Sequence, residues 1–271
     1  MRVLLSLAVI VLAWTSLELE PAAQQAPRLS VLIEQLERGE PAISDIHWSF
    51  IDMEHGPYLI DQLQTRLADL KEDGSSRPTP TPIVRIPFEG SQDPQFAVKQ
   101  VLDSGAFGIA FPRVETAAQA RRAVTSMRYP PQRGSALPEP RGRRGYGPFR
   151  AARYWGLEGP DYLRRADVWP LNPEGELFAM IMIESGPGVE NIDEILQVPG
   201  IGAVFIGTSD LGMALGVGPP SQGNAPEAEA AVQTIFRSCR RHDVVCAYVL
   251  GRDDLATRIS QGAGMFLGGA P

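Results

Sequence analysis

Five polar residues could take part in catalysis, and each lies at or just after the end of an apolar run. Glu54 and His55 follow the run in FIDMEHGPY, and Arg85 lies in PIVRIP. Glu184 follows the run in IMIESGPG, and Asp210 follows the run in FIGTSDLG. Runs that are apolar on both faces are typical of buried parallel strands, and parallel barrels place their active sites at the carboxyl ends of such strands. The five residues therefore form one candidate site.

Glu184 and Asp210 could bind one divalent metal ion between them. A single helix-sized segment separates the two residues, so their strands are expected to be neighbours, about 4.8 Å apart. Two carboxylates that leave other positions open suit Mg²⁺ or Mn²⁺, with Co²⁺ and Zn²⁺ as further candidates. The alternative is that Asp210 only caps the helix that follows it, a common role of aspartate.

Arg85 and His55 are the candidates for charge stabilisation and proton transfer. Arg85 lies in a run that is otherwise apolar, so we expect it to face the barrel mouth and hold an oxyanion or carboxylate; a structural salt bridge is the alternative. His55 is the histidine that lies at a strand end, and histidine is a common general base, although a structural role stays open. The only lysines, Lys71 and Lys99, fall in a predicted loop and a predicted helix, which does not favour Schiff-base chemistry.

Alternating strands and helices must position these residues. Amphipathic segments of helical period lie between several of the apolar runs, and a helix is expected at 29–41, ended by Gly39 and Pro41. The predicted strand segments are 47–56, 81–87, 107–115, 177–186, 202–210, 244–251 and 264–271. This alternation predicts an α/β protein with a (β/α)8 TIM barrel, a fold of roughly 250 residues. A doubly wound open sheet is the alternative.

The composition restricts the classes of function. The chain has 271 residues, of which 44% are hydrophobic and 21% charged, as in an ordinary globular protein. Its net charge of -7 argues against nucleic acid or an anionic membrane as a partner and favours a small-molecule substrate. The motifs of serine hydrolases, P-loop NTPases and dinucleotide-binding enzymes are absent from the sequence. Cys239 and Cys246 are expected to be buried thiols, with a disulfide between them as the alternative.

The N-terminal residues resemble a targeting segment. Arg2 precedes an apolar run at 3–14, which is shorter than the roughly 20 residues of a membrane span and fits the core of a signal peptide. We expect residues 1–26 to be a leader for export to the periplasm or the medium, with a buried helix in a cytoplasmic protein as the alternative. Residues 27–271 are expected to form one barrel domain.

One long segment at about 130–176 breaks the alternation of strands and helices. It contains five arginines between Arg141 and Arg153, and loops of this length are usually functional or disordered. Trp155, Tyr162 and Trp169 favour an ordered segment. The arginines could bind an anionic ligand or a neighbouring subunit, or they could form a solvated surface.

Six motifs carry a family resemblance. FIDMEHGPY, PIVRIP, VLDSG, RYPP, IMIESGPGVENIDEI and FIGTSDLGMALG occur in this order, and in them the chain resembles the metal-dependent HpcH/HpaI aldolases, which are related to citrate lyase beta subunits. The resemblance covers about residues 45–270. It implies a TIM barrel that assembles as a homo-oligomer, usually a hexamer. It also implies cleavage of a 4-hydroxy-2-oxo acid to pyruvate, or a related oxo acid, plus an aldehyde.

The resemblance also assigns roles at the site. It implies that Glu184 and Asp210 bind the metal ion and that Arg85 steadies the pyruvate enolate. The ion would draw electrons from the substrate carbonyl, so that the carbon–carbon bond breaks when the 4-hydroxyl loses its proton.

Proton transfer and substrate binding are assigned in the same way. The resemblance implies that His55 is the base, acting through water, and that Asp103 of VLDSG orients it. The backbone amides of Ser209 and Asp210 would hold the substrate carboxylate.

The chain departs from the family pattern in three places. Met182 stands where the family usually has glutamine, the first strand–helix unit is shortened to little more than AISDI, and the chain stops at LGGAP, where the family continues into a helix. Two alternative functions therefore stay open. One is a CoA-thioester lyase of the citrate lyase beta type, and the other is a non-catalytic barrel that binds a small acid.

Overall fold

The computed structural model describes residues 26–72, 74–75, 77–221, 223–250 and 255–268. The predicted leader falls on residues 1–26, and all of it except Ala26 lies outside this part of the chain. Within the described part, no helix is long and apolar enough to cross a membrane.

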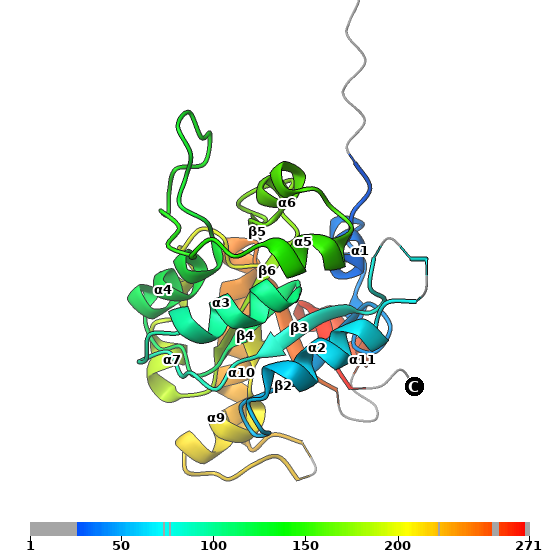
Figure 1. Cartoon of the computed structure of the whole chain (residues 1–271). Coiled ribbons are helices and arrows are strands. Elements are labelled where there is room, and N and C mark those ends of the chain that lie inside the picture. The colour runs from blue at the N-terminus through cyan, green and yellow to red at the C-terminus, as the bar shows by residue number, and fades with distance from the viewer. Residues whose placement is uncertain (1–25, 73, 76, 222, 251–254, 269–271) are drawn as a thin grey trace, which may run out of the picture.

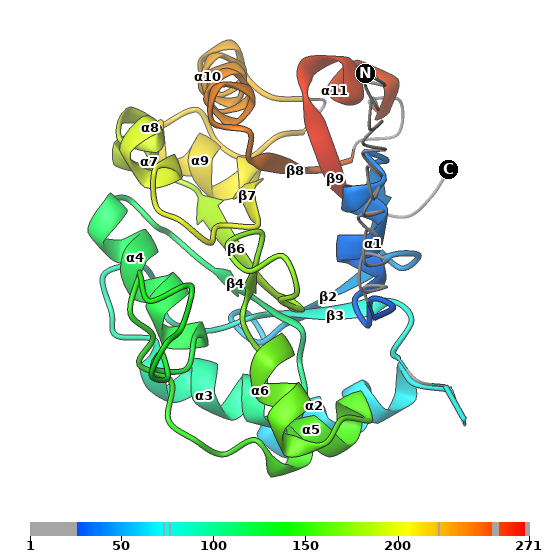
Figure 2. The same ribbon diagram turned by 90° about the horizontal axis from the view of Figure 1, so that it is seen from above.

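Eight parallel strands form a nearly closed barrel (Figure 2), which confirms the predicted fold. The strands of the sheet are β1 (Ala42–Ile43), β2 (Trp48–Asp52), β3 (Thr81–Arg85), β4 (Gly108–Phe111), β5 (Val168–Trp169), β6 (Leu177–Ile183), β7 (Ala203–Ile206), β8 (Val245–Val249) and β9 (Ala263–Leu267). Their order is β1-β9-β8-β7-β6-β4-β3-β2, and β5 pairs with β6 off this path. Each of the seven predicted strand segments overlaps one of these strands.

Helices cover the outside of the barrel (Figure 1). They are α1 (Val31–Glu37), α2 (Ile60–Asp69), α3 (Gln95–Ser104), α4 (Ala117–Met127), α5 (Phe149–Trp155), α6 (Gly159–Arg165), α7 (Gly186–Glu190), α8 (Ile192–Leu196), α9 (Thr208–Ala214), α10 (Pro226–His242) and α11 (Leu255–Gln261). The helical connections between strands return the chain to the amino-terminal end of the next strand, so all strands end at the same edge of the barrel.

The strands bury both faces, which explains their continuous apolar sequences. All seven residues of β6 are buried. Phe178, Met180 and Met182 pack inside the barrel against residues of the other strands. The alternate residues Ile181 and Ile183 belong to a second cluster, which lies between the strands and the helices. This alternation sends every second side chain into the barrel. Glu184 is the next residue in the inward-facing series and lies at the carboxyl edge of the barrel.

The first strand–helix unit is short, as the sequence predicts. β1 has two residues, paired in parallel with β9, and four residues connect it to β2 without a helix. A single bridge between Ser44 and Trp48 joins β1 to β2. Helix α1 lies on this side of the barrel (Figure 2), and its Leu32 and Ile33 are fully buried in the inner cluster. The N-terminal helix thus fills the barrel end where the shortened unit leaves a gap.

The segment between α4 and β6 is ordered, as its aromatic residues predict. It contains α5, α6 and β5, and part of it rises away from the barrel (Figure 1). Trp155 stacks on Phe107, which lies between α3 and β4, with ring centroids 4.2 Å apart. Tyr162 is fully buried. Two of its arginines pair with acids on α3 or beside it: Arg143 with Asp93 and Arg144 with Asp103. These arginines connect the segment to the barrel.

Candidate active site

Arg85 and two carboxylates meet at the carboxyl ends of β2 and β3. The parallel register places Asp52 directly beside Arg85. The guanidinium donates from Nε to Asp52 Oδ1 at 3.0 Å and from Nη2 to Oδ2 at 2.5 Å, while Nη1 lies 3.1 Å from Glu54 Oε2. The Arg85 side chain is 11% exposed. Arg85 therefore lies at the barrel mouth, as predicted. It also forms the salt bridge that was the alternative.

The ion pair shifts both partners toward their charged forms. Burial alone would raise the pKa of Asp52, but hydrogen bonds from Arg85 and from the Glu54 N–H hold it below the usual range. Burial alone would lower the pKa of Arg85, but the hydrogen bonds and charge of Asp52 raise it. Arg85 is thus a permanent cation with a fixed position.

The loop after β2 shows what the acids and the histidine that follow this apolar strand do. Asp52 Oδ1 accepts hydrogen bonds from the backbone N–H groups of Glu54 at 2.9 Å and His55 at 3.3 Å. Asp52 therefore holds the turn as well as Arg85. The His55 side chain is 65% exposed, with Nε2 3.8 Å from Glu54 Oε2. His55 is accessible at the mouth, beside an acid that binds Arg85.

Glu184 is the most buried acid at this edge. It is 5% exposed, and its Oε2 accepts a 2.9 Å hydrogen bond from the backbone N–H of Arg113. Its side chain packs so closely on Gly207 that a Cβ there would lie 2.4 Å from Oε1. Burial raises the pKa of Glu184 to about 7, and the charges of Asp210 and Glu54 add to this shift against the opposing Arg113 hydrogen bond. The carboxylate lies in a negative potential that a cation would relieve.

The raised pKa predicts how the stability of metal-free protein depends on pH. In the folded protein Glu184 keeps its proton up to about pH 7, whereas in the unfolded chain it releases the proton near pH 4.5. The contribution of Glu184 to the free energy of unfolding is therefore complete below about pH 4.5 and is lost as the pH rises through about 7. Glu184→Gln should remove the dependence and make the chelated protein more stable by roughly 3 kcal/mol near pH 8. Urea unfolding at several pH values measures this. The exposed control Glu194→Gln should follow the parent, and identical curves for both variants would contradict the prediction.

Asp210 lies beside Glu184, in the first turn of α9. Gly207, not Asp210, occupies the N-cap position, and no side-chain capping bond is made there. Asp210 therefore does not cap α9, which was the alternative to metal binding. Asp210 and Ser209 are both exposed at the mouth, and the charge of Asp210 contributes to the pKa shifts of Glu184 and Glu54.

The structure does not bring Asp103 to His55. Asp103 lies at the end of α3, which leads into the amino-terminal end of β4, whereas His55 follows the carboxyl end of β2. Its Oδ1 accepts a 2.7 Å hydrogen bond from Nη2 of Arg144, whose side chain is fully buried. Among the described residues, the acid that lies beside the His55 ring is Glu54, with Oε2 3.8 Å from Nε2.

Apolar side chains form the floor below the charged residues. Phe50 stacks on Phe205 with ring centroids 5.8 Å apart, and the Arg85 guanidinium lies 5.3 Å from the Phe50 ring centroid. Met182 is 1% exposed in the same inner cluster. The departure from glutamine at this position therefore gives the floor another apolar side chain.

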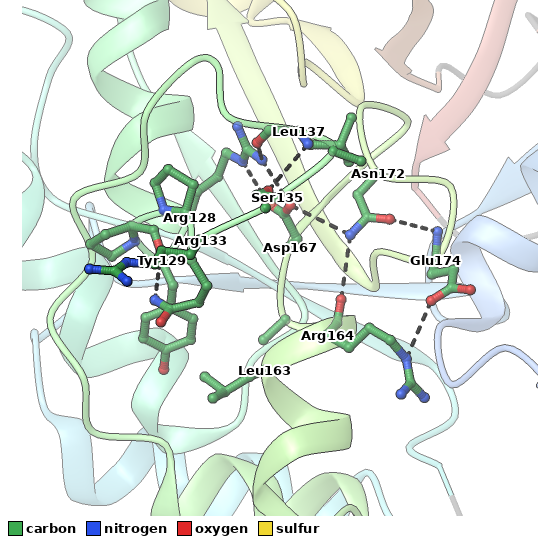
Figure 3. Close-up of a pocket in the computed structure, with 16 residues that line it drawn as sticks. Arg128, Tyr129, Arg133, Ser135, Leu137, Leu163, Arg164, Asp167, Asn172 and Glu174 are labelled. Atoms are coloured by element: carbon green, nitrogen blue, oxygen red, sulfur yellow. Dashed lines mark hydrogen bonds and ion pairs between the residues drawn. The ribbon is translucent and has the colours of Figure 1, made fainter.

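A hollow lies away from this site. The segment after α4 and helix α6 line a pocket of about 440 Å³ (Figure 3). Its Arg128 forms a bidentate pair with Asp167 at 2.6 and 2.9 Å, and its Arg164 lies 3.3 Å from Glu174. Both guanidinium groups are thus paired with acids of the same segment.

Two features of the site were not found from the sequence. One is the hydrogen bond from the Arg113 backbone to Glu184, which has no signature in residue types. The other is the pairing of Arg85 with Asp52 and Glu54. Adjacent strands that both end in charged residues could have indicated the second feature, but only the register shows which residues are opposite each other.

Comparisons with known proteins identify the family. The model of the HpcH/HpaI aldolase/citrate lyase family matches residues 39–269. The 2-keto-3-deoxy-L-rhamnonate aldolase of Escherichia coli O9:H4 (strain HS) is 35% identical over 217 residues, covering 79% of this chain and 70% of the relative.

Solved structures show the same fold. An HpcH/HpaI aldolase/citrate lyase family protein from Burkholderia cenocepacia J2315 is 25% identical with a TM-score of 0.72, covering 88% of this chain and 91% of that one. An HpcH/HpaI aldolase from Desulfitobacterium hafniense DCB-2, at 24% identity, has a TM-score of 0.70 and covers 87% and 88%. The chain belongs to the HpcH/HpaI aldolase/citrate lyase family and is a carbon–carbon lyase of the aldolase type.

Proposed function

We propose that this protein is a metal-dependent aldolase that cleaves a 4-hydroxy-2-oxo acid to pyruvate, or a related oxo acid, plus an aldehyde. The observation that carries the proposal is the position of Glu184. A buried carboxylate with a pKa of about 7 lies at the carboxyl edge of the barrel, within the electrostatic influence of Arg85 and Asp210. The fixed guanidinium of Arg85 suits a reaction whose intermediate is an oxyanion, and the carboxylates of Glu184 and Asp210 suit a divalent ion.

Glu184 and Asp210 would hold the divalent ion, Mg²⁺ or Mn²⁺. The donor set fits these hard cations, because it consists of carboxylate oxygens and leaves positions for water and substrate. No group of three or more His, Cys, Asp and Glu side chains is arranged for a metal in the described ranges. A bound ion would polarise the 2-oxo group of the substrate as a Lewis acid.

Arg85 would stabilise the negative charge that develops on the enolate oxygen. Its guanidinium is already fixed by Asp52 and Glu54, so it does not have to reorganise when the charge forms. The apolar floor below it excludes water and strengthens the interaction.

His55 would accept the proton of the 4-hydroxyl group, directly or through one water molecule. As this proton leaves, the C3–C4 bond breaks, its electron pair passes to the enolate, and the 4-carbon becomes the aldehyde. Protonation of the enolate at C3 then gives pyruvate. The assignment of the Ser209 and Asp210 amides to the substrate carboxylate rests on the family resemblance.

The substrate belongs, on this proposal, to the same broad class as 2-keto-3-deoxy-L-rhamnonate, the compound in the name of the 35% identical relative. That compound is a 4-hydroxy-2-oxo acid, as the proposed cleavage requires. The homo-oligomer, the export and the single barrel domain stay predictions.

Exchange of the pyruvate methyl protons in heavy water tests the proposal without the native aldehyde. NMR should show exchange with Mg²⁺ or Mn²⁺ and none after chelation, because enolate formation requires the ion. Glu184→Gln with added metal should exchange no faster than the chelated parent. The exposed control Glu194→Gln should behave as the parent.

Absence of exchange in folded protein with added metal would contradict the pyruvate aldolase. In that case, calorimetry with a CoA thioester would separate the remaining functions. Released heat would favour the citrate lyase beta type, and its absence would favour a barrel that binds a small acid without turnover.

A further inference from the structure

Arg113 occupies an unusual backbone position next to Glu184. It follows the carboxyl end of β4 and has a φ of 50°, in the left-handed region that side chains other than glycine rarely adopt. The chain is fixed on both sides: Val114 N–H donates to Met182 O at 3.1 Å, and Pro112 O accepts from Gly90 N–H at 3.0 Å. The backbone of Arg113 is therefore held firmly at the mouth.

This position brings the arginine close to the proposed reaction centre. The Arg113 N–H donates to Glu184 Oε2 at 2.9 Å, so the Arg113 Cα is at most about 4.4 Å from that oxygen. The long stem of an arginine that starts so near can place its guanidinium over the volume next to Glu184.

The guanidinium of Arg113 is not committed to the fold. It is 44% exposed, and its ion pair is with Glu89 at 3.9 Å, itself 51% exposed. No hydrogen bond of this guanidinium is found among the described residues. By contrast, Arg85 and Arg144 are at most 11% exposed and make short bonds to acids. An exposed pair at this distance contributes little, so the charge of Arg113 is available to a ligand.

The sheet order supports one assignment of the part of the substrate that would meet Arg113. β6, which ends at Glu184, lies between β7 and β4. In the proposed function the substrate carboxylate lies on the β7 side, at Ser209 and Asp210. The rest of the molecule then extends across Glu184 toward the β4 side, where Arg113 lies.

We infer that Arg113 binds an anionic group on the aldehyde half of the substrate and selects for aldehydes that carry one. The inference rests on the proposed function and adds the substrate class. A guanidinium forms two parallel hydrogen bonds with a carboxylate or phosphate, which makes it selective for such groups over neutral ones. The incoming anion would replace the loose contact with Glu89.

Aldol addition of pyruvate to two aldehydes of similar shape tests this assignment. Glyoxylate carries a carboxylate, and isobutyraldehyde carries an isopropyl group of nearly the same shape. Arg113→Met keeps the backbone donor to Glu184 and much of the side-chain length but removes the charge. We expect the ratio of kcat/KM for glyoxylate over isobutyraldehyde to fall about 10- to 100-fold in Arg113→Met, mainly through KM for glyoxylate. Arg113→Lys should recover part of it.

The controls separate this inference from the proposed function. Arg121→Met, on the exposed surface of α4, should keep the parent ratio. Pyruvate exchange by the parent tests the proposed function separately, because the enolate forms without the aldehyde. An unchanged ratio together with normal exchange would overturn the role of Arg113 alone. Failure of the parent to exchange pyruvate would overturn the proposed function and this inference with it.

Discussion

Arg85→Lys is expected to slow metal-dependent exchange of the pyruvate methyl protons by about 100- to 1,000-fold, the usual effect of removing one preorganised oxyanion donor. Lysine keeps the positive charge but presents it at a single point. It cannot donate to both oxygens of Asp52 and reach Glu54 at the same time, as the guanidinium does at 2.5 to 3.1 Å. The ammonium would therefore not occupy the same fixed position opposite the enolate oxygen.

A matched control is available on the surface. Arg38 pairs with Glu34 on α1 and is 56% exposed, so Arg38→Lys should keep the exchange rate of the parent. Circular dichroism and the thermal midpoint show whether the Arg85 variant is folded. If folded Arg85→Lys exchanges at the rate of the parent, the charge at the mouth suffices and its fixed geometry is not the cause of catalysis.

Asp103→Ala is expected to destabilise the protein by about 3 to 5 kcal/mol, the usual cost of leaving a buried charge without its partner. Arg144 belongs to the segment after α4, and its side chain is fully buried. Its Nη2 donates to Asp103 Oδ1 at 2.7 Å and to the Tyr162 hydroxyl at 3.0 Å, and its guanidinium lies 4.5 Å from the Tyr129 ring centroid. Removing the carboxylate leaves the hydroxyl and the ring, which cannot neutralise the charge. Asp103→Asn keeps an acceptor oxygen and should cost less.

The neighbouring arginine provides the control. Arg143 pairs with Asp93 at 2.6 Å, but the two side chains are 36% and 60% exposed, so Asp93→Ala should cost less than about 1 kcal/mol. Urea unfolding of the two alanine variants compares a buried pair with an exposed pair on the same segment. Equal losses would show that water reaches Arg144 in the folded protein.

Much of the fold could be predicted from the sequence because its signals are local. Buried parallel strands need apolar residues on both faces, so segments such as LFAMIMI at β6 are recognisable without knowledge of their neighbours. Residue type likewise identified Arg85 and Glu184, since a charge at the end of a buried run needs a reason. The short first unit was visible as well, because AISDI is too short for a strand and a helix.

The partners of these residues could not be predicted in the same way. Asp103 was assigned to His55 by resemblance, yet it pairs with Arg144, which is 41 residues away along the chain. Glu184 receives its hydrogen bond from Arg113, 71 residues away. Such contacts depend on how strands and helices pack, and no local pattern of residue types specifies them.

The sequence by itself thus determined the alternation of strands and helices and the residue types at the strand ends, because both depend on short-range periodicity and burial. The family was indicated by the resemblance of its motifs. The tertiary structure decided which of these residues meet. The strand register places Asp52 opposite Arg85. At the mouth, the buried carboxylate of Glu184 packs closely on Gly207. The raised pKa of Glu184 arises only there, because loss of water and the charges of Asp210 and Glu54 act through space rather than along the chain.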